Sequence, residues 1–163
     1  MDNLCVVIAG GRRARIFLAR KSGSPRAPIA LVERGVLSNP DLRTRGRSVT
    51  GRVRTETNTN RQAGPMHPMG AQRERHRIEL ERRFSVEVAR RAAALARNWT
   101  AGSVVLVADP HMLGFLRAAV RGGLKRPIQV RELARDYVRL TRSRLRDRLV
   151  ADGILPARGG GAR

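Results

Sequence analysis

The chain has 163 residues and a formal net charge of +21, and only two of its 34 basic residues are Lys. Hydrophobic residues make up 41% of it, which suits one domain with a real core. The composition excludes a membrane-spanning chain, because no apolar stretch approaches the length that a bilayer requires, and it excludes a disulfide framework, because Cys5 is the only cysteine.

The first forty residues predict three strands joined by short turns. A continuous apolar run at 4–9 is typical of a strand that is buried on both faces. Two glycines at 10–11 supply a tight turn into a second strand over 14–19. A third strand follows over 29–37, with a bend or bulge at 33–35. Short connections between neighbouring strands predict an antiparallel meander.

Helices and strands alternate in the second half of the chain. A helix over 73–98 carries apolar residues at spacings of four, four, four and three. These residues are Leu80, Phe84, Val88, Ala92 and Leu95. A strand over 103–108 follows, and Asp109 and Pro110 then suit the cap and the first position of another helix. Because helices separate these later strands, we expect them to pair in parallel.

The last predicted elements are a short strand at 128–130 and a helix that begins at Arg131 and reaches Leu149. If this helix is unbroken, Arg side chains at positions 131, 135, 139, 142 and 146 line one face. A break near Thr141 fits equally well, because Thr can cap a new helix there. The element order predicts an α/β fold: a mixed sheet of about five strands, with helices packed on it, in a ribonuclease H-like topology. We expect one domain over 1–155 and a flexible basic tail over 156–163.

Residues 43–75 are expected to form a long basic loop. The stretch 43–77 holds nine Arg against two acids, together with four Gly and two Pro, and no apolar period runs through it. A long loop inside a small domain is usually functional or disordered, and a charge of +21 is typical of a protein with a polyanionic partner. We therefore expect nucleic acid as the partner, chiefly structured RNA, the ribosome or tRNA, without membrane insertion.

The predicted nucleic-acid-binding side chains lie at the first hairpin turn, in the basic loop and at the start of the long helix. They are Arg12, Arg13, Arg43, Arg45, Arg47, Arg52, Arg54, Arg61, Arg73, Arg75 and His76. Arg suits such a surface because its planar guanidinium contacts phosphate through two donors and stacks on bases. We expect this binding to be electrostatic capture without catalysis.

Enzyme chemistry is not favoured by the sequence. A two-metal nuclease needs clustered carboxylates, but the strand at 4–9 holds none, and Asp109 is explained as a helix cap. The three His residues have no spacing that suggests zinc, and no phosphate-binding loop motif is present. We therefore expect no metal and no cofactor. The apolar run at the N-terminus is too short for a secretion signal, so we expect a cytoplasmic protein.

Several segments resemble the bacterial host attachment protein family. They are 7–17, Asn39-Pro40 with Arg43 and Arg45, His76 with Arg83-Phe84, 104–117 and 131–149. The resemblance covers about residues 4–150, and 104–117 is its most distinctive segment. The chain departs from the family at Gly10, where Asp is usual, and its loop is more basic. The resemblance implies an alternative function as an interaction protein in bacterial attachment or surface colonisation, acting directly or indirectly.

The family in turn looks similar to the central domain of the eukaryotic and archaeal peptide chain release factors. In those factors, a long loop before the central helix carries Gly-Gly-Gln and enters the ribosomal peptidyl transferase centre. The matching loop of this chain ends in Gly70-Ala71-Gln72, just ahead of the expected helix. Ala71 replaces the second Gly and restricts the backbone there. The resemblance thus implies a third function, peptidyl-tRNA hydrolysis.

Overall fold

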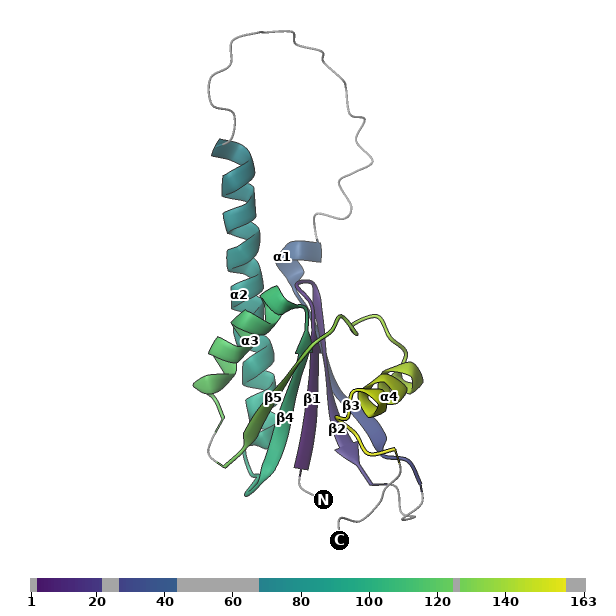
Figure 1. Cartoon of the computed structure of the whole chain (residues 1–163). Helices are drawn as coiled ribbons and strands as arrows, with labels where there is room; N and C mark the ends of the chain where they lie inside the picture. The colour runs from purple at the N-terminus through teal and green to yellow at the C-terminus, as the bar shows by residue number, and fades with distance from the viewer. Residues whose placement is uncertain (1–2, 22–26, 44–67, 125–126, 158–163) are drawn as a thin grey trace.

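The computed structural model describes residues 3–21, 27–43, 68–124 and 127–157. Five strands form one mixed sheet in the order β3-β2-β1-β4-β5. They are β1 (Asn3–Ala9), β2 (Arg13–Arg20), β3 (Ala30–Ser38), β4 (Gly102–Ala108) and β5 (Gln129–Ala134). The first three strands pair antiparallel as a meander, whereas β4 pairs in parallel with β1 and β5. The predicted α/β fold of ribonuclease H-like topology is therefore confirmed (Figure 1).

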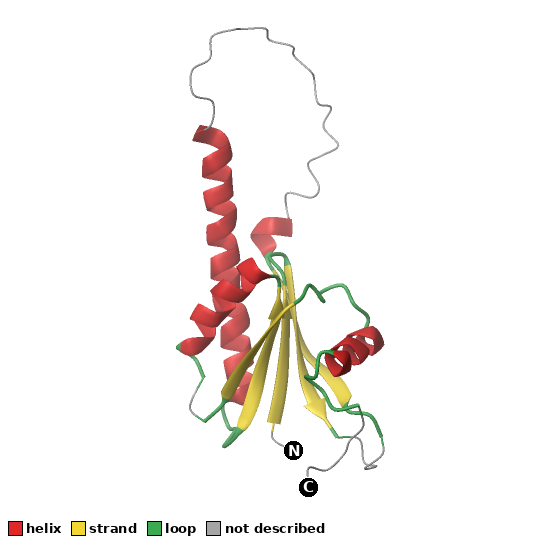
Figure 2. Cartoon of the chain, viewed as in Figure 1, coloured by secondary structure: helices red, strands yellow, loops and turns green. Residues whose placement is uncertain are grey.

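The described helices are α1 (Pro40–Arg43), α2 (Pro68–Ala96), α3 (Pro110–Arg121) and α4 (Arg142–Ala151). Figure 2 shows α2 and α3 on one face of the sheet and α4 on the other. Alternate residues of β1 serve the two faces: Val7 packs with α2 and α3, and Val6 and Ile8 pack with α4. This double burial explains the continuous apolar run. Within the described residues, no helix is both long and apolar enough to cross a membrane.

The long helix begins earlier than expected. Its predicted apolar stripe is correct, because Leu80, Phe84, Val88 and Ala92 are buried. However, α2 starts at Pro68, a residue whose fixed φ suits the first helical position, so residues 68–75 are helical and are not loop. Arg43, the other end of the expected loop, is the last residue of α1. Residues 44–67 lie outside the described part of the chain.

The expected helix at Arg131 is wrong. Residues 129–134 pair in parallel with β4 as an edge strand, whose side chains mostly face solvent. Backbone hydrogen bonds to β4 therefore override the local helical preference of Arg, Glu and Leu. The alternative break is confirmed, since Thr141 caps α4 by accepting a hydrogen bond from the backbone N–H of Arg144. Arg131, Arg135 and Arg139 consequently share no helix face with the residues of α4.

The bend expected at 33–35 is a β-bulge. Ile16 pairs with Gly35 and Phe17 pairs with Glu33, so Arg34 is the additional residue on β3. Beside the bulge, the Nε of Arg15 on β2 donates a hydrogen bond to the carboxylate of Glu33 on β3 at 2.8 Å. The guanidinium of Arg15 also lies 4.9 Å from the centre of the Phe17 ring. These contacts of Arg15 therefore join β2 to β3 beside the bulge.

Candidate functional site

The β1–β2 turn is held rigidly at the carboxyl end of β1. The backbone N–H of Gly10 donates to the carbonyl of Arg13, and that of Asn39 donates to the carbonyl of Arg12, each at 2.9 Å. The side-chain amide of Asn39 donates to the carbonyl of Gly11 at 3.1 Å. Arg12 and Arg13 are exposed and thus extend from a backbone that hydrogen bonds fix in place. In the sequence, Asn39 was noted only as part of a segment that resembles the host attachment family.

Glu81 on α2 connects the β1–β2 turn to α2 and α3, the two helices on one face of the sheet. Its carboxylate is almost fully buried and accepts a hydrogen bond from Arg77 at 2.6 Å. The Nε2 atom of His111 on α3 lies 3.4 Å from its other oxygen. The backbone of Gly11 lies so close that a Cβ atom there would be 2.5 Å from the Glu81 Oε1. Burial of a carboxylate is tolerated where such partners surround it.

Neither Glu81 nor Asn39 was predicted as a site residue. The sequence gives only a slight signal for Glu81. This residue directly follows Leu80 of the apolar stripe, so its side chain lies at the border of the buried face of the helix. The carbonyl of Leu80 also accepts a hydrogen bond from the Asn39 amide at 3.3 Å. Three segments that are far apart in the chain therefore meet at one joint, formed by Gly11, Asn39 and Glu81.

The start of α2 projects beyond the end of the sheet (Figure 1). The side chains of residues 70–76 are all exposed, and no described acid pairs with Arg73, Arg75 or His76. Arg77 pairs with both Glu74 and Glu81, and its hydrogen bond to Glu74 is the main reason why the pKa of Glu74 is lowered. Such pairs support a helix that is polar on all sides.

The predicted site residues that the structure describes lie at the same end of the molecule. Arg12 lies in the β1–β2 turn and Arg13 begins β2 next to it. Arg43 ends α1, and Arg73 and Arg75 lie on the projecting turns of α2 (Figure 1). His76 follows them on the same helix. The remaining predicted residues lie outside the described part of the chain, and they are Arg45, Arg47, Arg52, Arg54 and Arg61.

The tripeptide Gly70-Ala71-Gln72 is helical. It belongs to the first turns of α2 and does not lie ahead of the helix as expected. The only described glycines with positive φ are Gly102 and Gly153, so Gly70 uses no conformation that a side chain would forbid. Ala is also the best helix former, and Ala71 therefore suits its position. The tripeptide extends the exposed surface of the projecting helix.

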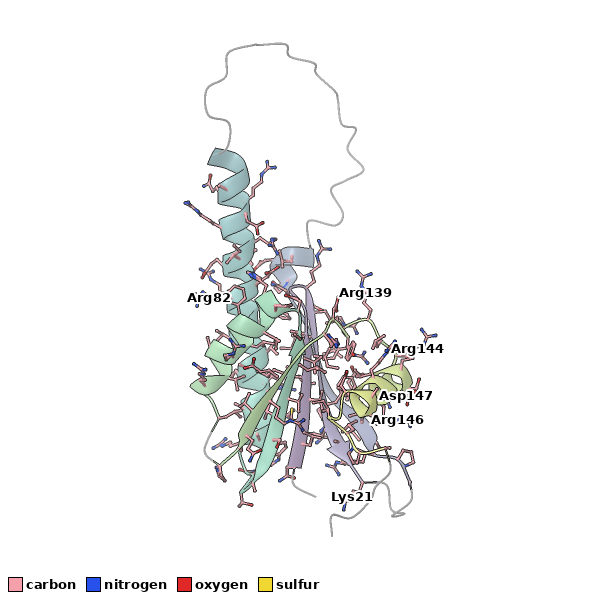
Figure 3. The ribbon with its side chains drawn as sticks, viewed as in Figure 1. Lys21, Arg82, Arg139, Arg144, Arg146 and Asp147 are labelled. Carbon is pink, nitrogen blue, oxygen red and sulfur yellow. The ribbon has the colours of Figure 1, made fainter. Side chains whose placement is uncertain are left out.

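A basin lies next to the β1–β2 turn. It has a volume of about 630 Å³ and is lined by the turn itself, by Asp109 at the end of β4, and by Asp136 and residues 138–141 after β5. Asp109 also caps α3 as predicted, because its Oδ1 accepts hydrogen bonds from the N–H groups of His111 and Met112 at 3.0 Å. Arg139 lies exposed on the segment that leads to α4 (Figure 3). Among the described residues, no three His, Cys, Asp or Glu gather in a group suited to a metal ion.

Comparisons with known proteins identify the family. A family model described as "Protein required for attachment to host cells" matches residues 5–149. None of the curated proteins that were compared matches the chain. Among solved structures, the chain is similar to the type II variant of the Aquifex aeolicus Ppx/GppA phosphatase, with 13% identity and a TM-score of 0.37, over 81% of this chain and 36% of that one. That likeness is too low to carry a functional argument. The family model covers most of the sequence, and the chain therefore belongs to the family of proteins required for attachment to host cells.

Proposed function

We propose that this host attachment family protein binds structured RNA, such as the ribosome or tRNA, through its arginine-bearing end. This end comprises Arg12 and Arg13, where the β1–β2 turn meets β2, and Arg73, Arg75 and His76 on the projecting part of α2. The observation that carries the proposal is that these cations are exposed and have no described acidic partner. The net charge of +21 agrees with a polyanionic partner.

The distribution of acids along α2 supports this assignment. Glu74 is the only acid in the exposed stretch 70–76, and Arg77 pairs with it. Further along the helix, Glu79 pairs with both Arg82 and Arg83. The middle of α2 therefore has cations that its own acids neutralise, whereas the projecting turns keep theirs available for an external anion.

The length of the projecting helix supports structured RNA as the partner. The stretch from Pro68 to Leu80 corresponds to about 20 Å of helix, at 1.5 Å per residue. An A-form helix displays its phosphates and 2′-hydroxyl groups along a wide, shallow minor groove, and proteins recognise it mainly by shape. The projecting helix and the β1–β2 turn provide two separate sets of contacts to such a backbone.

Two variants with the same net charge test the proposal. The first replaces Arg12, Arg13, Arg73 and Arg75 with Gln. The second, the control, replaces four exposed arginines elsewhere with Gln, and they are Arg91, Arg97, Arg121 and Arg131. Binding to a labelled RNA hairpin is measured by fluorescence anisotropy. We expect the first variant to lose affinity by roughly tenfold or more and the control to lose much less. Equal losses of affinity in the two variants would show that only the net charge matters, and would contradict RNA binding at the arginine-bearing end.

A role in attachment or surface colonisation is the second candidate, and the family match favours it. The same cationic end could contact an anionic partner at the cell envelope. Sedimentation of cell lysate with and without ribonuclease separates the two candidates. Movement of the protein out of the ribosomal fractions after ribonuclease treatment supports RNA binding. Association with envelope fractions, unchanged by ribonuclease, supports the attachment role.

A further inference from the structure

The basin beside the β1–β2 turn lies at the carboxyl ends of two parallel strands whose connections diverge. β1 and β4 are neighbouring parallel strands, and their chains leave in opposite directions. β1 turns back into β2 on one side, whereas β4 continues through α3 to β5 on the other. In open α/β sheets, ligands bind in the crevice at the carboxyl ends of strands where the connections diverge in this way. The basin of about 630 Å³ lies at this point.

One wall of the basin is firmly attached to the sheet. The segment after β5 begins with the N–H of Arg135, which donates to the carbonyl of Ala108 at 2.9 Å. Near its other end, the Arg15 Nη1 donates to the carbonyl of Leu140 at 2.7 Å. Between these points, Val138 lies in ordinary contact with Gly10, at 3.5 Å from where a Cβ atom would stand. The wall is therefore part of the folded structure.

The side chains around the basin carry both signs of charge. Arg12, Arg13 and Arg139 are exposed at the basin, and no described acid pairs with any of them. Arg15 also lines the basin, but it forms an ion pair with Glu33. Three guanidinium groups around one hollow suit a phosphate monoester, which accepts several charge-assisted hydrogen bonds.

Two carboxylates at the basin favour a ligand that has hydrogen-bond donors in addition to a phosphate group. Asp109 and Asp136 line the same basin, and each uses Oδ1 to accept backbone N–H groups. No hydrogen bond from a described residue reaches either Oδ2 atom. These oxygens would repel an inorganic anion but can accept hydrogen bonds from hydroxyl or amino groups. Val138 and Leu140 add apolar surface to the lining.

We propose that this basin binds a nucleoside 5′-monophosphate group. The arginines hold the phosphate, the aspartates accept hydrogen bonds from the ribose or base, and Val138 contacts the base. The volume lies in the range of small-molecule sites. The group can come from a free nucleotide or from the 5′ end of an RNA chain. The second source rests on the RNA binding proposed above, whereas the first does not.

The test uses the full chain, adenosine 5′-monophosphate as the probe, and adenosine and inorganic phosphate for comparison. Calorimetry is expected to show binding of the nucleotide that is at least roughly tenfold tighter than binding of either part. Arg139→Gln should weaken nucleotide binding by roughly tenfold, because it removes a charged contact to the phosphate. Arg131→Gln on β5 removes the same charge away from the basin and should leave binding unchanged. Thermal melting checks that both variants are folded.

RNA oligomers with a 5′-phosphate or a 5′-hydroxyl group, of one sequence, distinguish the two sources. Tighter binding of the phosphorylated oligomer, lost in Arg139→Gln, assigns the basin to RNA ends. Nucleotide binding without that preference assigns it to free nucleotides. Failure to bind the nucleotide, together with no preference for the 5′-phosphate, overturns the basin proposal even if RNA binding persists. Loss of RNA binding alone, with nucleotide binding intact, overturns only the proposed RNA function.

Discussion

The carboxylate of Glu81 lies directly against the backbone of Gly11, seventy positions earlier in the chain. A Cβ atom at residue 11 would be 2.5 Å from the Glu81 Oε1 and 2.9 Å from its carboxyl carbon. Arg77 and His111 hold that carboxylate from the other sides. The absence of a side chain at Gly11 therefore allows the β1–β2 turn to pack on α2, and this contact sets where Arg12 and Arg13 are presented.

Gly11→Ala should separate the turn from α2. We expect a loss of about 1–3 kcal/mol in the free energy of unfolding, because the neighbouring carboxylate is buried and paired and cannot easily move. Gly114→Ala is the matched control. Gly114 is in α3 with nothing within 4 Å of a new Cβ atom, so this change should stabilise the protein by about 0.5–1 kcal/mol. Urea unfolding measures both, and equal effects would contradict the contact.

Asn39→Asp tests the second connection of the same joint. The Asn39 amide is buried and donates to the carbonyls of Gly11 and Leu80. A carboxylate cannot donate, and three oxygens would then meet in a buried place. We expect a loss of about 2 kcal/mol or more in the free energy of unfolding, together with faster amide hydrogen exchange in the β1–β2 turn. Unchanged exchange in the turn would show that Asn39 does not hold it.

Cys5 provides a prediction about pH. Burial in β1 raises the pKa of its thiol to about 12, above the ordinary value of 9.0. The unfolded chain loses this proton at lower pH than the folded chain does. The resulting contribution to stability is therefore fully present below about pH 9 and is lost as the pH rises towards 12. In the native state at pH 8, the thiol should resist a thiol-specific reagent that modifies it rapidly in urea. Rapid native modification would contradict its burial.

Several elements were predictable because their signals are local. The apolar run of β1, the stripe of α2 and the Asp109-Pro110 start of α3 all lie within single segments. The strand predicted at 128–130 exists, but its extension to residue 134 was not predicted. Residues 131–134 are polar and suit a helix, and they form a strand through pairing with β4, some 26 positions earlier. The exposed arginines could be named from composition, but the joint of Gly11, Asn39 and Glu81 could not, since tertiary packing alone brings these residues together.

The helical position of Gly70-Ala71-Gln72 leads to a prediction about hydrolysis. We expect the wild-type chain not to hydrolyse peptidyl-tRNA, and we expect Ala71→Gly, which restores Gly-Gly-Gln, not to create the activity. A tripeptide within α2 cannot adopt the extended conformations that glycines permit in a loop. The substitution should instead destabilise the helix by about 0.5–1 kcal/mol. Release of labelled peptide that disappears in Gln72→Ala would reverse this conclusion and favour a hydrolase.

The salt dependence of RNA binding tests the central claim most directly. Each phosphate contact contributes roughly 0.7–0.9 to the slope of log K against log salt concentration, because bound counterions are released. Between about 50 and 200 mM salt, we expect a steep slope for the wild type. Replacing Arg12, Arg13, Arg73 and Arg75 with Gln should reduce that slope by roughly 3, because four phosphate contacts are lost. An affinity that does not change with salt, or a slope that the four substitutions leave unaltered, would contradict RNA binding at this end of the molecule.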